Sequence, residues 1–435
     1  MAGSAASRRE SFSPLQDIPP MCIWNRSHSE SILDWGTVLA SIPSFRSTRV
    51  ARASLLSLGL VLLGSCGESA EPGTADQVAE WRIGAPTLTL GSIGGEDDAF
   101  SPIRSLAIGP DDVLYLLLPQ ESRVAVFSVD GSVVASIGRA GDGPGEFSFP
   151  TALGVIGDTL WVMDPRAQRI NYFENLQFVE AVAFSQPSGL HPERRAREVA
   201  VLKGGGVLMV TDSQSPFDPS VTTTPSLILV RHDDRLDTLA TYSTDNRAGF
   251  LIRMSGGAIS MMRPFTQPFT AAGRWAVSPD ATAVLLVDQE QSGVEQGESS
   301  FGVTMLRTSG DTVLSTRLSY SPIPIPPGHV EAVLADLRGD QFTEEEVRES
   351  IFLPPHYPPV SGALIATDGS IWIGREAQLN SSVTWNVLSS TGEWIANLTI
   401  PSGFTVHAVS GDHVWGLTHD EFDVPYVERR PIVRR

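Results

Sequence analysis

The sequence predicts an all-β fold: a six-bladed β-propeller of four-stranded antiparallel blades, with a short two-helix insertion between blades four and five. Three observations predict this fold. A segment of about 46 residues recurs along the chain. Each copy contains four short apolar runs separated by turn residues. The 39 glycines and 31 prolines among 435 residues are typical of a chain with many turns.

The amino-terminal 65 residues have the composition of an export signal rather than of a blade. Residues 54–63 form an apolar run that is too short to span a bilayer, and Arg46, Arg49 and Arg52 precede it. Small residues follow it, an order typical of a secretory signal. A buried helix of a soluble protein is the alternative interpretation. We therefore expect residues 1–65 to be an unstructured leader plus signal peptide.

The sequence Leu63-Gly64-Ser65-Cys66 resembles the lipobox of bacterial lipoproteins. The resemblance implies cleavage before Cys66, lipidation of its thiol, and export to the cell envelope on the periplasmic or the outer surface. Residues 66–84 are small, polar and acidic, so we expect a flexible tether there and the propeller over 85–435.

The long leader before the signal has no helical or strand period. We expect the natural start to lie later, at Val38 or Val50, which leaves open whether residues 1–49 are translated. The other of the two cysteines, Cys22, lies in this leader. Because both cysteines lie outside every expected strand, we expect no disulfide in the core.

Two adjacent segments, residues 90–136 and 137–181, align as the first two blades. In the first, four apolar runs alternate with turns, and Asp130-Gly131 is a strong hairpin signal between the last two. The expected strands are Ser105–Ile108, Val113–Leu117, Val124–Ser128 and Val133–Ile137. A single four-stranded sheet cannot bury both of its faces, so neighbouring blades must stack against it.

Weaker copies of the pattern predict the remaining blades. The third is expected over Glu198–Val210, Leu227–Val230 and Thr238–Tyr242; the fourth over Gly273–Val287, Phe301–Arg307 and Asp311–Leu318; the fifth over 361–400; and the last over Val406–Val409, Val414–Leu417 and Tyr426–Arg429. The last copy lacks an outer strand, which residues 86–90 could supply. A seventh blade would require a division of the irregular stretch 185–270.

Residues 138–173 resemble the NHL-repeat family of β-propellers, and residues 91–127 do so in part. The resemblance rests on the Gly-rich loop Gly138–Gly145, the Phe147 and Pro150 entry, and Asp164 with Arg169-Ile170. The whole of 85–435 resembles the six-bladed NHL-like and TolB-like propellers found among bacterial lipoproteins. NHL-like propellers include lyases and lactonase-like hydrolases that use the central channel, so this resemblance implies an enzyme as the alternative function.

Residues 329–352 break the β pattern. Val330, Val333, Leu334 and Leu337 have helical spacing, and Thr343 with Glu346 forms a capping box at the start of a second short helix. Proline-rich segments flank both helices. Insertions of this kind map to loops on one face, which is often the binding face.

The candidate chemical motifs favour structural roles. The string Gly141–Gly145 lacks the Lys-Ser/Thr of a phosphate loop. Asp164 and Arg169 are expected to bond within the blade, because the position of Arg169 recurs as Arg123 in the first repeat. Only Glu198 is acidic among the expected starts of the inner strands, so no ring of metal ligands is expected. The sequence offers no catalytic, metal or cofactor residues, and whether the chain is an enzyme stays open, with a non-enzyme favoured.

We therefore predict a binding or scaffolding module on the envelope, held to the membrane through lipid on Cys66. Its partner is an unknown envelope protein or small ligand; a purely structural lipoprotein is a further alternative. A net charge of -19 disfavours nucleic acid. The candidate residues of the ligand face are Arg104, His356, Tyr357, Arg375, His419 and Asp420.

Overall fold

The computed structural model describes residues 78–92, 99–184, 196–211, 224–231, 235–242, 249–253, 262–266, 268–289, 299–338, 342–375 and 381–434. The chain divides into a unit of residues 1–73 and the unit Thr74–Arg435, and every described residue belongs to the second. The expected signal peptide, both cysteines and the start of the tether lie outside the described residues. Within them, no helix is long and apolar enough to cross a membrane.

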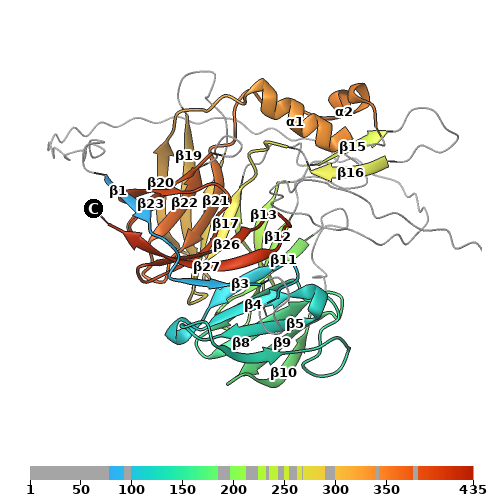
Figure 1. Cartoon of the computed structure of the whole chain (residues 1–435), viewed down its shortest axis with the longest axis vertical. Helices are drawn as coiled ribbons and strands as arrows, with labels where there is room; N and C mark the ends of the chain where they lie inside the picture. The colour runs from blue at the N-terminus through green and yellow to red at the C-terminus, as the bar shows by residue number, and fades with distance from the viewer. Residues whose placement is uncertain are drawn as a thin grey trace, which may run out of the picture. The chain divides into compact units, whose positions relative to one another are not determined.

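The described strands form a propeller arrangement of four-stranded antiparallel blades (Figure 1). Four separate sheets have four strands each. They are β3 (Ser105–Ile108), β4 (Leu114–Leu118), β5 (Arg123–Phe127) and β6 (Val133–Ile137); β7 (Ala152–Ile156), β8 (Thr159–Asp164), β9 (Arg169–Glu174) and β10 (Gln177–Ala183); β11 (Ala196–Val201), β12 (Val207–Thr211), β13 (Ser226–Val230) and β14 (Leu236–Thr241); and β17 (Arg274–Val277), β18 (Ala283–Asp288), β19 (Ser300–Arg307) and β20 (Thr312–Ser319).

A nine-stranded sheet contains the last part of the chain and its first two described strands. It is built from β21 (Val360–Ile365), β22 (Ile371–Arg375), β23 (Val383–Leu388), β24 (Trp394–Ile400), β25 (Thr405–Ser410), β26 (His413–His419) and β27 (Pro425–Val433), with β1 (Ala79–Ile83) and β2 (Leu88–Leu90). The predicted strands of every repeat are thus present, with boundaries shifted by a few residues.

The blades are held together by apolar clusters that lie between successive sheets. One cluster joins Tyr115 and Val126 of the first sheet to Leu160 and Phe173 of the second. The second strands of the blades are buried on both faces, as in the continuous apolar run Leu114–Leu118. Outer strands such as β6 keep exposed residues and an alternating pattern. Burial on two faces favours unbroken apolar runs, and burial on one face favours alternation.

The first strands of the sheets lie next to one another in chain order. In the described part, β3 contacts β7, β7 contacts β11, β17 contacts β21, β21 contacts β25, and β25 contacts β3. The sheet of β11–β14 packs against that of β17–β20, because Leu208 shares a cluster with Val284 and Leu286, and Lys203 N donates a hydrogen bond to Ala281 O (2.8 Å). We call β3, β7, β11, β17, β21 and β25 the inner strands.

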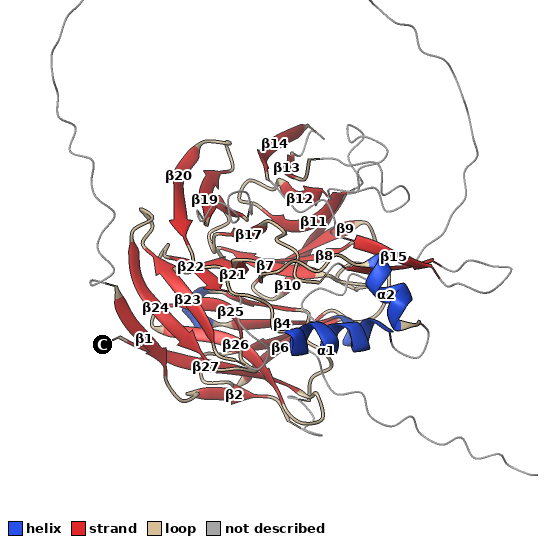
Figure 2. Ribbon diagram, turned by 90° about the horizontal axis from the view of Figure 1, so that it is seen from above, coloured by secondary structure: helices blue, strands red, loops and turns tan. Residues whose placement is uncertain are grey.

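The amino-terminal strands close the structure. Strand β2 pairs antiparallel with β27, with Leu88 opposite Arg429, which confirms the expected closure of the last repeat. Strand β1 was not expected, because residues 66–84 were assigned to a tether. It pairs parallel with β24 and antiparallel with β27, and thereby joins the strands of the last two repeats in one sheet (Figure 2). The sheet therefore begins at Ala79, and the boundary expected at residue 85 was too late.

The glycine of the predicted hairpin, Gly131, contributes to this closure. Its φ of 89° lies in the region that favours glycine. A Cβ atom there would lie 2.7 Å from Leu88 Cδ1 of β2. The turn between β5 and β6 can therefore pack closely against the amino-terminal strand because residue 131 is a glycine and has no side chain.

The predicted helical insertion is present as α1 (Pro327–Arg338) and α2 (Glu344–Ser350). Thr343 and Glu346 form the expected capping box. The helices share a small apolar cluster of their own, which includes Leu334, Phe342 and Val347. In the stretch 185–270, which a seventh blade would have divided, the described residues form the sheet β11–β14 and one two-stranded hairpin, β15 (Gly249–Arg253) and β16 (Met262–Thr266). Helix α2 contacts β15 (Figure 1).

The two ends of the blades differ in their connections. Short turns link each inner strand to the next strand at one end, as at Gly411-Asp412; we call this the turn end. The inner strands begin at the opposite end, which we call the mouth end. The longer connections between blades, including α1 and α2, leave and enter at the mouth end.

Candidate functional site

All six predicted ligand-face residues lie at the mouth end, because each precedes an inner strand or follows the end of a second strand. Arg104 directly precedes β3, and His356 and Tyr357 directly precede β21. Arg375 is the last residue of β22, and His419 is the last residue of β26, with Asp420 after it. Connectivity thus brings residues distant in sequence to one end, although their side chains have different roles.

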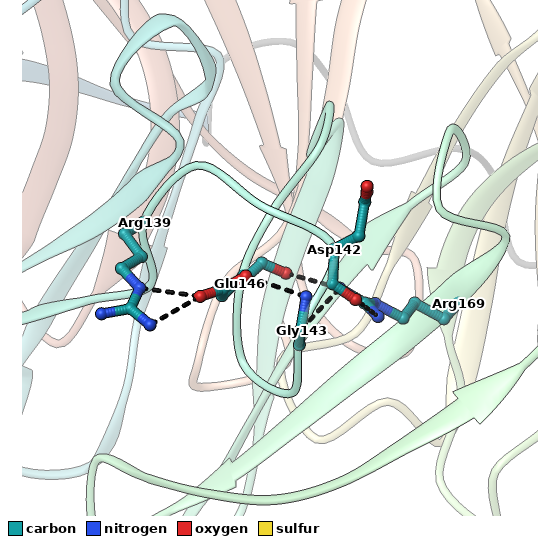
Figure 3. A network of polar contacts seen from close by, with 5 residues as sticks. All are labelled: Arg139, Asp142, Gly143, Glu146 and Arg169. Carbon is teal, nitrogen blue, oxygen red and sulfur yellow. Dashed lines mark hydrogen bonds and ion pairs between the residues drawn. The ribbon is translucent and has the colours of Figure 1, made fainter.

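The Gly-rich loop of the second blade is a structural element (Figure 3). Arg169 donates hydrogen bonds to the carbonyl oxygens of Asp142 (2.8 Å), Gly143 (2.9 Å) and Glu146 (2.9 Å). The Glu146 carboxylate accepts from the Gly143 amide and pairs with Arg139. These contacts hold the pKa of Glu146 below its ordinary value, with the Gly143 amide the largest cause. The loop is therefore fixed by its own residues.

Asp164 completes this arrangement from the end of β8. Its buried carboxylate accepts hydrogen bonds from the backbone amides of Ser148 (2.6 Å), Phe149 (3.1 Å) and Ala167 (3.0 Å). The repeat motif thus uses Asp164 and Arg169 to position the segment that enters the blade. The structural interpretation of both residues is confirmed.

Arg375 occupies the matching place in the fifth repeat, at the end of β22, but it has a different environment. Its guanidinium carbon lies 5.1 Å from the centre of the Phe301 ring and 5.3 Å from that of Tyr320, both in the preceding sheet. Burial is the main cause that lowers the pKa of Arg375 from its ordinary value. No residue of the described part forms an ion pair with it.

Tyr357 anchors the helical insertion to the propeller. It is buried, and its hydroxyl lies 2.5 Å from Nδ1 of His329 in the first turn of α1. The ring of Phe269 packs edge-on against both rings. Burial lowers the pKa of His329, which favours the neutral imidazole as acceptor from the tyrosine. Tyr357 is thus a buried contact of the insertion rather than an exposed ligand contact.

His356 lies where the two ends of the insertion meet. It forms a β-bridge with Pro324, and the flanking backbone bonds join Ile325 N to Pro355 O (3.1 Å) and Tyr357 N to Ile323 O (2.9 Å). The chain therefore leaves and re-enters the propeller through adjacent strands. The 29 residues between these bonds, 326–354, form an excursion whose two ends are hydrogen-bonded to each other.

His419 and Asp420 belong to the connection between β26 and β27. Asp420 accepts hydrogen bonds from the amides of Phe422 and Val424, both at 2.9 Å. Its carboxylate therefore holds the turn, which carries the exposed Phe422 at its tip. His419 is exposed, as is Arg104.

His407 was not among the predicted site residues, although the sequence placed it in the last repeat. It lies on inner strand β25 at a β-bulge, where the register shifts between Val406 and Ala408. Burial, with a smaller contribution from His419, lowers the pKa of His407 to about 4. The bulge could not be predicted from apolar alternation, because a strand of six residues offers too few positions to reveal the shift that one extra residue causes.

The mouth end carries arginine where a metal-dependent propeller would need carboxylates. Among the described residues, no group of three or more His, Cys, Asp or Glu side chains could hold a metal ion. Arg104 precedes β3, Arg197 lies in β11, and Arg274 begins β17. The side chain of Glu198, the one acid expected at an inner-strand start, lies outside the described side chains.

Comparisons with solved structures report propeller proteins of low similarity. A DUF4221-family protein from Bacteroides vulgatus is 8% identical, with a TM-score of 0.46 over 82% of this chain and 99% of its own. A gluconolactonase from Xanthomonas campestris is 13% identical (TM-score 0.37; 82% and 88%), and a virginiamycin B lyase from Staphylococcus aureus is 10% identical (TM-score 0.37; 79% and 88%). No protein-family model and no curated protein matches the chain.

Proposed function

We propose that the chain is an exported, lipid-anchored six-bladed β-propeller that acts as a binding module in the cell envelope. The count of six takes the four separate four-stranded sheets as four blades. The nine-stranded sheet then supplies two more, β21–β24 and β25–β27 with β2. One apolar cluster lies between these two halves and joins Trp372 and Leu398 to Val406 and Val414. A second cluster lies between β25–β27 and the first sheet, which supports the treatment of the two halves as separate blades joined through β1.

One observation carries the binding proposal: the inserted elements gather at the mouth end. Helices α1 and α2 and the hairpin β15–β16 arise from two different inter-blade connections, yet α2 contacts β15. The ends of the helical excursion are hydrogen-bonded to each other, so the blades do not need it for their own closure. An insertion that the scaffold does not need is a feature typical of a recognition element.

The direction of the first strand supports an anchor on the opposite side. Ala79 pairs with Ala396, close to the turn that precedes β24, so the chain enters the propeller near the turn end. Residues 67–78 separate Cys66 from β1 and reach about 40 Å at most when fully extended. The chain therefore enters the propeller near the end opposite the mouth end.

Deletion of the insertion tests this proposal. Residues 327–353 are replaced by a short Gly-Ser linker, and the variant is compared with the intact chain for thermal unfolding and for photo-cross-linked partners in native envelopes. We expect an almost unchanged melting temperature and loss of the cross-linked partner. The matched control exchanges exposed residues of the turn end, such as Glu393→Ser, and should retain the partner. Retention of the same partner by the deletion variant would refute the assignment.

A further inference from the structure

Arg375 is a cation at the boundary between two blades. Its position is fixed, but it forms no ion pair with a described residue. Its backbone is fixed, because Arg375 pairs with Val360 and its carbonyl oxygen accepts a hydrogen bond from the Ser361 hydroxyl (3.1 Å). Its side chain crosses to the preceding sheet and covers two rings whose centres are 6.0 Å apart, Phe301 and Tyr320. Stacking on aromatic faces orients a guanidinium without occupying its N–H groups.

Those N–H groups have no acceptor in the described part of the chain. No hydrogen bond or ion pair engages the guanidinium, yet its nitrogens are not among the fully buried atoms without partners. They therefore remain accessible from outside. A partly buried charge without a counter-ion is costly, and ring contacts offset only part of that cost. An anion that binds from solution would complete the arrangement.

Other arginines of this acidic chain have carboxylate partners. Arg123, Arg139, Arg231, Arg348, Arg430 and Arg434 each pair with a carboxylate in the described part. Fifty acidic residues against thirty-one basic ones make a partner easy to find. At the mouth end, however, Arg104, Arg166 and Arg197 also lack an ion pair with any described residue. The mouth end thus combines Arg375 with further unpaired positive charge.

The residue at the position of Arg375 has different roles in different repeats. In the second blade the matching position is Asp164, whose carboxylate binds the amides of the entering segment. The segment that enters the fifth blade is held instead by Gln289, which follows β18 of the preceding sheet. The Gln289 side chain accepts a hydrogen bond from the Val360 amide and donates one to the Ala272 carbonyl. Arg375 therefore does not have the structural role that Asp164 has at the matching position of the second blade.

We propose that Arg375, together with Tyr320, whose ring its guanidinium covers, binds the oxyanion group of a small ligand, a carboxylate or a phosphate. The planar fork of an arginine matches both groups through two parallel hydrogen bonds. Burial raises the pKa of Tyr320, so its hydroxyl remains protonated and can donate a further bond. This inference rests on the proposed function in that it names a ligand class for the same end of the propeller.

Calorimetric titration of the folded chain, with Cys66→Ser to keep it in solution, tests the inference. Citrate and succinate are the carboxylate probes, and inorganic phosphate and glycerol phosphate are the phosphate probes. We expect one class to bind, with affinity reduced about tenfold or more in Arg375→Gln, because a bidentate pair is lost. Arg375→Lys, which keeps the charge but not the fork, should fall between the two. Arg317→Gln, an exposed arginine bonded to Ser300 on the same sheet, is the matched control and should bind as the parent does.

Two outcomes would overturn the inference: the parent binds neither class, or Arg375→Gln binds as tightly as the parent. Should Arg375→Gln fail to fold, Tyr320→Phe keeps the ring and removes the hydroxyl, and it should still weaken binding several-fold. Equal binding by that variant would then count against the site. This inference and the proposed function can be tested separately. Deletion of the helices should remove the cross-linked partner and leave anion binding by Arg375 unaffected.

Discussion

Trp81 tests whether the first strand belongs to the propeller. It lies in β1, packs on the cluster of β21–β24, and has Arg434 4.9 Å above its ring, with the ring of Trp372 6.4 Å away. Exchange of a core tryptophan for alanine costs about 3–5 kcal/mol. Because Trp81 is only partly buried, we expect about 2 kcal/mol from lost burial, and the lost cation–π contact adds about 0.5–1 kcal/mol.

Together these contributions predict that Trp81→Ala lowers the unfolding free energy by about 3 kcal/mol. Large domains lose roughly 2 °C or less in melting temperature for each kcal/mol, so we expect a decrease of about 5 °C. Differential scanning calorimetry measures it, with Trp81→Phe as the control that keeps an aromatic ring and should lose much less. An unchanged melting temperature in Trp81→Ala would show that residues 66–84 are a tether throughout and that β1 adds nothing to the sheet.

Three further predictions follow from single contacts. Asp164→Ala removes the acceptor of three amides and should destabilise the chain by about 3 kcal/mol or more, with faster proteolysis at 142–149; a parent-like cleavage pattern would contradict this role. His407 is neutral in the folded chain, so its contribution to stability is present above about pH 6.5 and is lost as the pH falls from 6.5 towards 4, by at most about 3 kcal/mol. His407→Gln should flatten that part of the pH–stability curve. An equal slope in the parent and the variant would refute this prediction. Cys66→Ser should move the protein from the membrane fraction to the soluble fraction after cell fractionation, whereas continued membrane association would exclude a lipid anchor at this cysteine.

The blades could be predicted from the sequence because their causes are local. Alternating apolar residues and turn pairs such as Asp130-Gly131 determine where strands start and stop, and β3 and β6 have the predicted bounds. The capping box at Thr343 is likewise a local signal, and α2 begins where it predicts. These features depend on neighbours within a few residues, which a single sequence displays.

Contacts between distant segments could not be predicted in the same way. Strand β1 is a five-residue run in acidic, polar surroundings, and its partners Ala396–Thr399 lie more than three hundred residues away. The candidate Arg375 lies at the same end as the helical insertion, but the rings that it covers come from another sheet, and no spacing rule connects Phe301 to Arg375. Asp420 was predicted as a residue of the ligand face, whereas two amides of its own turn engage its carboxylate. Packing between blades decides these roles.

Site-specific photo-cross-linking in native cells tests the central claim, that this propeller binds through its mouth end. A photoreactive residue is placed at Glu345 on α2 or at Arg104 before β3, and, as the comparison, at Ser132 or Glu393 in turns at the opposite end. We predict a discrete cross-linked partner from the mouth-end positions and none from the turn-end positions. Adducts formed from Ser132 or Glu393, with none from Glu345 or Arg104, would contradict the account.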